Sequence, residues 1–316
     1  MKERSTRFLE ELRERVFVCD GAVGTMLYSK GVAVNSCCEA LNLSMPSLIK
    51  EVHEAYIRAG AEIVETNTFG ANAARLASHG VAEKSREINL AGVRLARECA
   101  GNAILVAGAV GPLGVRLEPL GQYPVEQASK AFEEQVQALA EAGVDLIMFE
   151  TFYDLSEIRE AIAAARAVCD LPLIAQVTIG NDGNMPDGTC PENFTQKLME
   201  WGADAIGCNC SVGPQAMLGA IQRMAAVTNH PLSAQPNAGL PVKVGGRNIY
   251  SCSPEDMAGY TNQFIRSGVK LVGGCCGTTP EHIRAIRNAV GAVQAPRLQN
   301  SGQLIANQNL QAGQNL

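Results

Sequence analysis

The sequence predicts a single α/β domain folded as a (β/α)₈ barrel. First, four segments share one order of features, which is a helix end, a glycine and then a short apolar run. Glycine often ends a helix, and a short apolar run is typical of a buried parallel strand. Second, four more apolar runs alternate with amphipathic helical patterns, which brings the strand-and-helix units to eight. A doubly wound open sheet is the competing architecture.

Each predicted strand is an apolar run that is bounded by turn residues or by a helix end. In chain order the strand segments cover residues 15–20, 58–67, 103–110, 141–151, 172–178, 200–210, 231–237 and 266–276. In the four repeated segments the glycine lies where a helix C-terminus needs a left-handed residue, as at Gly60 and Gly143. The strands are therefore expected to lie parallel, with a helix between each pair.

Apolar residues at helical spacing predict a helix after each strand. These helices cover residues 47–59, 83–99, 125–142, 155–168, 193–201, 214–227, 254–267 and 280–290. The barrel domain is predicted over residues 1–294. The last 22 residues, 295–316, lose this periodicity and are rich in Gln, Asn and Gly, so they are predicted to be a flexible tail or linker.

Composition narrows the function classes. The chain has 316 residues, 47% of them hydrophobic, and a formal net charge of -6. No basic cluster stands out, which argues against a nucleic-acid or anionic-membrane partner. The charged N-terminus is unlike a secretory signal, and no apolar run is long enough to span a membrane, so a cytoplasmic protein is expected. The 11 cysteines are better explained by reduced thiols and a metal site than by a disulfide framework.

Three cysteines fall at the carboxyl ends of predicted strands, where barrel enzymes place their active sites. Cys210 ends one strand, and Cys275 and Cys276 end the last. Three thiolates at one point suit a catalytic zinc ion with one open coordination position. Side-chain alternation leaves Cys208 on the same face as Cys210, so a closed structural site with four cysteines remains an alternative.

A zinc ion held by three cysteinates favours a thiol as the fourth ligand. The centre carries a net charge of about -1, which makes it a poor generator of hydroxide. A bound thiol would ionise at neutral pH and keep enough charge on sulfur for nucleophilic attack. The predicted chemistry is therefore transfer of an alkyl group to a substrate sulfur, with no catalytic residue beyond the zinc site.

Other residues at the strand ends suit the rest of an amino-acid thiol. The loop DGAVGT begins with Asp20, Gly21 and Ala22, and its backbone N–H groups are predicted to bind a carboxylate. Glu150 is predicted to pair with the ammonium group. The amide oxygen of Asn237 is a candidate to fill the open metal position when no substrate is bound.

Seven segments spread over about residues 10–293 form a recognisable set: DGAVGT, ETNTFGAN, VGPLG, FETFYD, GCNCSVGP, QPNAGLP and GGCCGTTPEHI. Together they resemble the zinc-dependent homocysteine S-methyltransferases, and among these the homocysteine-binding module of cobalamin-dependent methionine synthases. The pair Asn209–Cys210 followed at a distance by GGCCG is the most specific part of this set.

The resemblance implies a role for particular residues. The implied zinc ligands are Cys210, Cys275 and Cys276, and Cys208 is excluded. Implied homocysteine contacts are Asp20, Gly21 and Glu150, with Asn67 and Thr68 lining the pocket and Asn237 near the metal.

The expected function is methylation of homocysteine to methionine, with the homocysteine bound as a zinc thiolate. A methylcobalamin- or methylfolate-linked domain or partner is the expected methyl donor. Two alternatives remain, which are a stand-alone enzyme that uses a small donor such as S-methylmethionine, and a non-catalytic module with structural zinc.

Overall fold

A computed structural model describes residues 2–244 and 247–294, and the predicted tail lies outside these residues. Eight parallel strands form one sheet in the order β1-β10-β7-β6-β5-β4-β3-β2. These are β1 (Phe17–Val18), β2 (Ile63–Glu65), β3 (Leu105–Val110), β4 (Leu146–Phe152), β5 (Leu173–Val177), β6 (Ala205–Asn209), β7 (Leu232–Gln235) and β10 (Val269–Val272). A parallel bridge between Cys19 and Ile63 joins the first and last strands of this order, so the sheet closes into a barrel. The predicted (β/α)₈ fold is confirmed.

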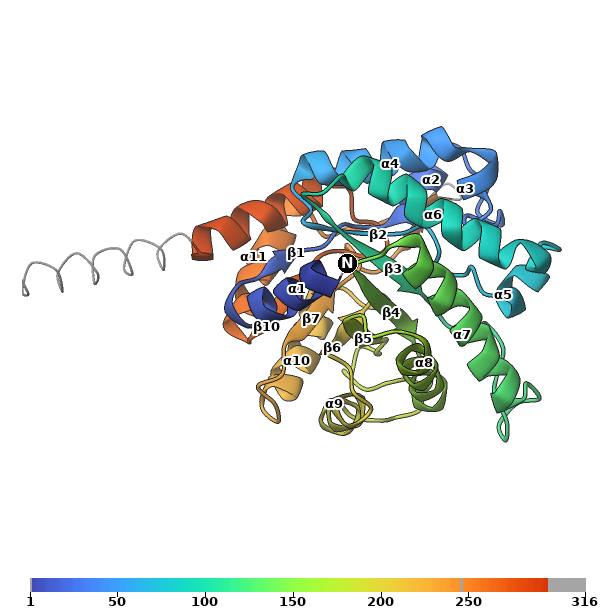
Figure 1. The fold of residues 1–316 in the computed structure, drawn as a ribbon. Coiled ribbons are helices and arrows are strands. Elements are labelled where there is room, and N and C mark those ends of the chain that lie inside the picture. The colour runs from blue at the N-terminus through green and yellow to red at the C-terminus, as the bar shows by residue number, and fades with distance from the viewer. Residues whose placement is uncertain (1, 245–246, 295–316) are drawn as a thin grey trace, which may run out of the picture.

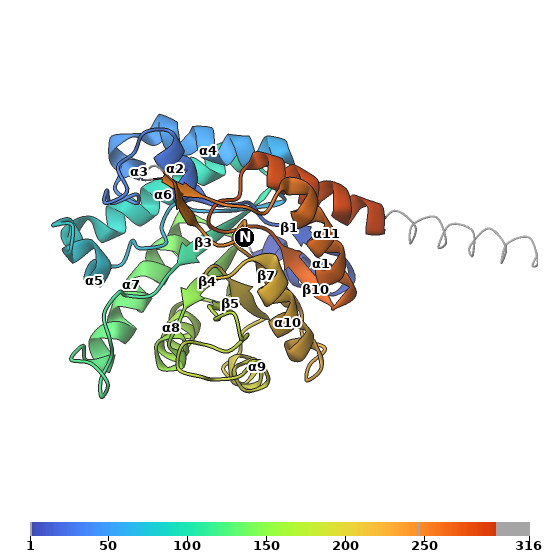
Figure 2. The ribbon, with the colours of Figure 1, turned by 180° about the vertical axis from the view of Figure 1, so that it is seen from behind.

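Helices surround the strands on all sides (Figures 1 and 2). The main helices are α4 (Pro46–Ala59), α6 (Ser85–Ala100), α7 (Val125–Ala142), α8 (Leu155–Val168), α9 (Pro191–Glu200), α10 (Pro214–Ala225), α11 (Pro254–Arg266) and a last helix at 280–294. Gly60 and Gly143 end α4 and α7 in left-handed conformations, with φ of 106° and 94°. The glycine signal therefore located these helix ends correctly.

Several smaller elements were not predicted from the sequence. They are α2 (Val23–Ser29), α3 (Leu41–Ser44), α5 (Ala73–Ala77), the 3₁₀ helix η1 (Ala82–Lys84) and the antiparallel hairpin of β8 (Val242–Val244) and β9 (Arg247–Ile249). Most of these elements lie in connections at the carboxyl ends of the strands, which we call the mouth of the barrel. They are too short for hydrophobic periodicity to reveal them.

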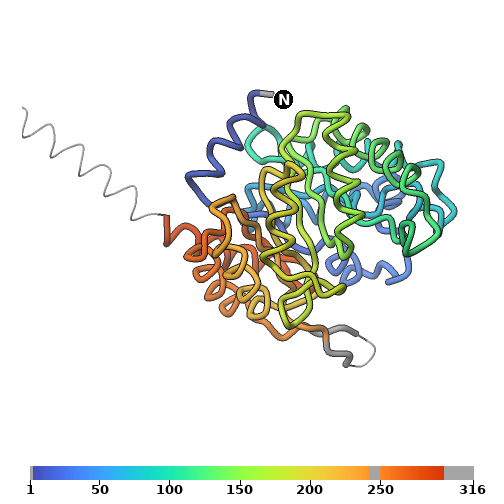
Figure 3. Tube along the Cα trace, turned by 90° about the horizontal axis from the view of Figure 1, so that it is seen from below, coloured from blue at the N-terminus to red at the C-terminus, as the bar shows by residue number. Residues whose placement is uncertain are grey.

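Helix α1 (Lys2–Glu14) closes the opposite end of the barrel, which we call the foot. In Figure 3 it lies at one end of the molecule, apart from the ring of helices. Phe8 and Leu12 are almost fully buried and pack with residues that line the barrel interior, among them Phe17 and Leu271. The sequence of this charged segment predicts no helix here and argues only against a signal peptide. Its two apolar side chains therefore fill the barrel interior at the foot.

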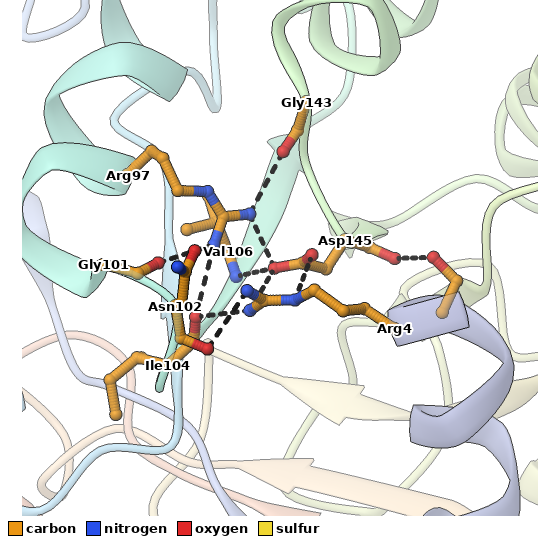
Figure 4. Close-up of polar contacts among 9 residues, drawn as sticks. Arg4, Arg97, Gly101, Asn102, Ile104, Val106, Gly143 and Asp145 are labelled. Carbon is orange, nitrogen blue, oxygen red and sulfur yellow. Dashed lines mark hydrogen bonds and ion pairs between the residues drawn. The ribbon is translucent and has the colours of Figure 1, made fainter. Parts of the chain in front are cut away.

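A buried carboxylate, Asp145, ties α1 to the foot of the barrel (Figure 4). Its side chain is 1% exposed and accepts hydrogen bonds from Arg97 at 2.7 Å, Arg4 at 3.2 Å and the backbone N–H of Val106 at 2.8 Å. The Asp145 carbonyl oxygen also accepts from Ser5 Oγ at 2.8 Å. Two guanidinium groups therefore compensate one buried charge, which is the condition for a buried ion pair to stabilise a fold.

No helix in the described part of the chain is both long enough and apolar enough to cross a lipid bilayer.

Candidate metal centre and substrate pocket

The three predicted ligand sulfurs meet at the mouth of the barrel. The Sγ atoms of Cys210, Cys275 and Cys276 all lie within 4.8 Å of one another, and Cys210 Sγ is 3.8 Å from Cys276 Sγ. Zinc–sulfur bonds of about 2.3 Å at tetrahedral angles separate two sulfur ligands by about 3.8 Å. In the described chain this is the only cluster of three or more His, Cys, Asp or Glu residues with metal-binding geometry. The spacing therefore fits a metal held by three thiolates.

The backbone at the end of β6 separates Cys210 from Cys208. Cys208 is fully buried, and its sulfur lies 3.8 Å from Met224 Sδ on helix α10. Regular alternation would turn Cys210 the same way. Instead the strand ends at Asn209, and Cys210 and Ser211 adopt positive φ of 58° and 61°. This left-handed turn places the Cys210 sulfur beside Cys275 and Cys276, and leaves Cys208 among the helices.

The loop after β10 is held against its neighbours by backbone hydrogen bonds. Cys275 N–H donates to the carbonyl of Pro236 at 2.8 Å, and the Cys276 carbonyl accepts from Ala238 N–H at 2.9 Å. Gly274 leaves no room for a side chain, because an added Cβ would lie 2.5 Å from Thr278 Cγ2. Gly274 therefore permits the close packing that presents the sulfurs of Cys275 and Cys276.

Electrostatics in the cluster favour a bound cation. Hydrogen bonds from Cys275 and Cys276 lower the pKa of the Cys210 thiol to about 3. The bond to Cys210 raises the pKa of Cys275 well above its usual value, and it raises the pKa of Cys276 to about 12. Ionisation of one thiol in the cluster therefore opposes ionisation of the other two. A divalent cation would supply the positive charge that lets all three ionise.

Asn237 lies beside this cluster, as the sequence predicts. Its side chain is 4% exposed and hydrogen-bonds to the Cys210 sulfur. Its Oδ1 atom is buried and has no hydrogen-bond partner among the described residues. Because a buried oxygen without a partner is costly, this atom fits a role as an oxygen ligand to a metal.

A cavity of about 450 Å³ opens next to the sulfurs. Of the predicted substrate residues, Gly21, Ala22, Asn67 and Glu150 line it together with the three cysteines. The predicted binding loop is shorter than expected, because helix α2 begins at Val23. The backbone N–H of Ala22 donates to Thr278 Oγ1 at 3.2 Å. This cavity is of the size that binds small molecules.

Asn67 and Thr68 serve mainly to hold the pocket wall. Asn67 Nδ2 donates to the Cys38 carbonyl at 2.8 Å, which anchors the loop before α3. Thr68 is fully buried, and its hydroxyl donates to the Ala109 carbonyl at 2.8 Å and bonds to Thr66 Oγ1 at 2.6 Å. The side chain of Thr68 lies behind the wall, and Thr66 lines the cavity in its place.

Glu65, at the end of β2, is a site residue that sequence reasoning missed. It lines the cavity, is 8% exposed and accepts a hydrogen bond from Gln235 Nε2 at 2.7 Å. Its side chain also hydrogen-bonds to that of Glu150. The predicted second strand extends to Asn67 and so places Glu65 inside the strand, whereas β2 ends at Glu65. A carboxylate directly after an apolar run was the signal that pointed to Glu150, and it applies equally to Glu65.

Asp20 is the third carboxyl group at this end of the barrel. It is 1% exposed, and its Oδ2 accepts the backbone N–H of Glu65 at 3.1 Å. Burial, followed by the charge of Glu65, raises the pKa of Asp20 well above its usual value. The same two causes, in the same order, raise the pKa of Glu150. These three groups, of which Glu65 and Glu150 line the cavity, form the acidic wall of the mouth.

Comparison with known proteins identifies the family. The homocysteine S-methyltransferase family matches residues 17–290. The chain is 34% identical over 314 residues to methionine synthase from Mycobacterium tuberculosis, and 34% identical over 303 residues to methionine synthase from Mycobacterium leprae. These alignments cover 94% and 90% of this chain but 26% and 25% of the relatives, so the chain spans about a quarter of their length.

A solved structure shares the whole barrel. The metallated form of the homocysteine methyltransferase MmuM from Escherichia coli matches with a TM-score of 0.75 at 27% identity, covering 90% of this chain and 99% of that one. Its oxidized form matches with a TM-score of 0.73 at 28% identity, covering 86% and 95% of the two chains. Because the family match spans most of the sequence, this chain belongs to the homocysteine S-methyltransferase family of enzymes.

Proposed function

We propose that this barrel binds zinc and homocysteine and catalyses transfer of a methyl group to the homocysteine sulfur, which yields methionine. The observation that carries this proposal is the convergence of the Cys210, Cys275 and Cys276 sulfurs beside a cavity at the mouth. The three cysteines would hold the zinc. When bound, zinc would supply the charge that lets the substrate thiol ionise at neutral pH while its sulfur stays nucleophilic.

The acidic wall would bind the other end of homocysteine. Glu150 lines the cavity and is the proposed partner of the substrate ammonium, with Asp20 behind it. Gly21 and Ala22 are the proposed partners of the substrate carboxylate. With both ends fixed, the thiol would be directed toward the cysteine cluster, so these residues would contribute by orientation.

The surface around the mouth supports a methyl donor that arrives on a macromolecule. Of six large hydrophobic side chains that are exposed in the described chain, five lie in connections at the mouth. These are Val34, Met45, Leu120, Tyr153 and Leu240. Exposed apolar side chains at this end of the barrel are consistent with an interaction site. We propose a domain or partner that carries a methylated cobalamin or folate. This fits relatives that are about four times as long.

A stand-alone enzyme with a small donor such as S-methylmethionine is the second candidate. Its support is the MmuM match, in which one barrel of this size accounts for 99% of a homocysteine methyltransferase. A closed structural zinc site is less well supported, because Cys208 faces helix α10. We also propose a cytoplasmic location, since all 11 cysteines are free thiols.

A donor assay tests the proposed activity. The zinc-loaded chain is given homocysteine together with methylcobalamin, methyltetrahydrofolate or S-methylmethionine, and methionine is measured. Methyl iodide serves as a small reactive donor that needs no binding site. Methionine from methyl iodide above the rate of the zinc-free chain supports thiol activation, and the natural donor that gives the fastest turnover identifies the class. No acceleration with any donor would overturn the proposal.

X-ray absorption at the zinc edge separates the catalytic from the structural site. Homocysteine should add one sulfur to the zinc coordination shell and displace a lighter atom. An unchanged shell with four sulfurs would identify a closed structural centre.

A further inference from the structure

Three carboxyl groups from three different strands meet in the described mouth without a cation between them. Asp20 follows β1, Glu65 ends β2, and Glu150 lies near the end of β4. No lysine, arginine or histidine among the described residues is seen to hydrogen-bond or ion-pair with any of the three. Buried carboxylates without a counter-ion are costly. The arrangement therefore calls for a ligand or a proton.

The contacts around Glu65 and Glu150 indicate that a proton would lie between these two carboxyl groups. Gln235 Nε2 donates to Glu65 at 2.7 Å, and Asn209 Nδ2 donates to Glu150 at 3.2 Å. The two carboxyl groups also hydrogen-bond to each other. An ionised carboxylate can only accept, so a bond between two carboxyl groups requires one proton between them. The metal-ligand cysteines supply none of these bonds.

A fixed amide network holds both carboxyl groups in place. Gln176 Nε2 donates to Gln235 Oε1 at 2.5 Å, which leaves the Gln235 amide nitrogen directed at Glu65. Asn209 Oδ1 accepts the backbone N–H of Thr151 at 2.7 Å, which directs its amide nitrogen at Glu150. Glu65 and Glu150 both line the substrate cavity. The pair is therefore oriented before any ligand arrives.

The electrostatic environment agrees with a shared proton. Burial raises the pKa of Glu65 above its usual value of 4.5, although hydrogen bonds from Gln235 and Glu150 partly offset this. Burial and then the charge of Glu65 raise the pKa of Glu150 well above its usual value. Cys210 and Asp20 add further negative charge beside Glu150. Burial and like charge therefore favour a proton on this carboxyl pair, as in other carboxyl pairs.

We propose that Glu65 and Glu150 together bind the ammonium group of the amino-acid substrate, which displaces a proton held between them in the free protein. This inference rests on the proposed function. On binding, the O–H bond of the carboxyl pair breaks, the proton leaves to solvent, and both carboxylates accept N–H bonds from the ammonium. The pair then carries one more negative charge, and the ammonium supplies one positive charge, so the charge of the site is conserved.

The exchange explains why the mouth tolerates unpaired carboxyl groups. The proton keeps the free site near a single negative charge, and the substrate replaces that proton with a cation of the same charge. A thiol without an ammonium group would leave the proton in place and gain no ion pair. Glu65 would thus help the barrel to distinguish an amino-acid thiol from other thiols.

Proton release during binding tests this inference. Homocysteine and 4-mercaptobutyrate share the thiol, the chain and the carboxylate, but only homocysteine has an ammonium group. Each is titrated into the zinc-loaded chain by calorimetry at pH 6.5, in buffers of different ionisation enthalpy. The thiol proton is common to both ligands. Homocysteine should therefore release about one more proton than 4-mercaptobutyrate.

Two variants connect this difference to the carboxyl pair. Glu65→Gln keeps the shape and offers a permanent N–H donor to Glu150, so the difference in released protons should fall to near zero. Homocysteine should then bind at least about 10-fold more weakly, with 4-mercaptobutyrate unaffected. Glu150→Gln should also abolish the difference, and it serves as the second variant should Glu65→Gln fail to fold.

Glu157→Gln is the matched control. Glu157 is also a carboxyl group at 1% exposure, but it accepts from the Leu113 N–H at 2.7 Å and does not line the cavity. This variant should keep the full difference. Equal proton release by the two thiols in the unmodified chain, or a difference that survives in Glu65→Gln, would overturn the inference. If neither thiol binds to the zinc-loaded chain, the proposed function itself fails.

Discussion

The two ends of this barrel bury carboxyl groups in opposite ways. At the foot, Asp145 is surrounded by Arg4, Arg97 and a backbone N–H. At the mouth, Asp20 and Glu65 have neutral donors and other carboxyl groups as neighbours. A buried charge with its counter-ions stabilises the fold, whereas a buried charge without them costs stability and is retained for another purpose. The difference indicates that the functional site lies at the mouth and not at the foot.

Backbone conformation also differs between the mouth and the foot. All three non-glycine residues with positive φ in the described chain lie at the mouth, at Thr151, Cys210 and Ser211, with φ of 63°, 58° and 61°. Asn209 bridges two of these segments, because its Oδ1 accepts the N–H of Thr151 at 2.7 Å. Such conformations cost energy and concentrate at functional sites. Among the described residues of the foot, positive φ occurs only at glycines.

The largest expected effect is the loss of one sulfur at the mouth. Cys276→Ser should weaken zinc binding by at least about 100-fold, since changes behind a ligand already cost 10- to 100-fold. Methionine formation should fall with the zinc content, because a serine hydroxyl does not ionise at neutral pH. Zinc per chain, measured with a chromophoric chelator, checks this. Cys208→Ala should keep its zinc, and equal zinc loss in both variants would contradict the assignment.

A smaller effect is expected when a counter-ion is removed at the foot. Arg97→Ala removes the 2.7 Å bond to Asp145 and should lower the free energy of unfolding by about 2–3 kcal/mol. Activity per folded chain should not change. Urea denaturation measures the loss. Arg86→Ala is the control, because its ion pair with Glu141 is exposed, so its removal should lower the free energy of unfolding far less. Equal losses of unfolding free energy in the two variants would show that the buried ion pair at the foot stabilises the fold no more than an exposed one.

The smallest expected effect has the opposite sign and lies at the mouth. The pKa of Glu65 is higher in the folded than in the unfolded chain. Ionisation of this buried carboxyl group therefore lowers the stability of the fold as the pH rises above the usual value of 4.5. The neutral variant Glu65→Gln avoids this cost. It should be more stable than the unmodified chain by about 1 kcal/mol at pH 8 and equally stable near pH 5. Thermal or urea unfolding at both pH values checks it, and a loss of stability at pH 8 would refute the idea.

Periodicity was sufficient to predict the barrel from the sequence. Short apolar runs and amphipathic helices determined eight units, and closure follows because β1 pairs with β10 and bridges to Ile63. The convergence of Cys210 with Cys275 and Cys276 was predictable for the same reason, since parallel strands deliver their ends to one face. Helix α1 was missed, because two buried apolar residues in a charged segment give a weak signal.

Other features depend on geometry that a sequence does not display. The direction of Cys208 could not be predicted, because alternation held only until the left-handed turn at Cys210. Glu65 was missed because the predicted second strand extends to Asn67, two residues beyond the end of β2. Asp145 is followed by an apolar strand and preceded by glycine and valine, and its arginine partners are 48 and 141 residues away in sequence. Contacts between residues so far apart in the sequence can be recognised only once the barrel fold is known.

The left-handed turn at Cys210 also bears on how this centre can evolve. Because the torsion of the backbone keeps residue 208 away from the cluster, no exchange of side chains at that position brings a fourth sulfur to the other three. Bringing residue 208 into the cluster would require an insertion or deletion near residue 210. Such changes are rarer than point substitutions, so the cluster is protected against recruiting this neighbouring thiol.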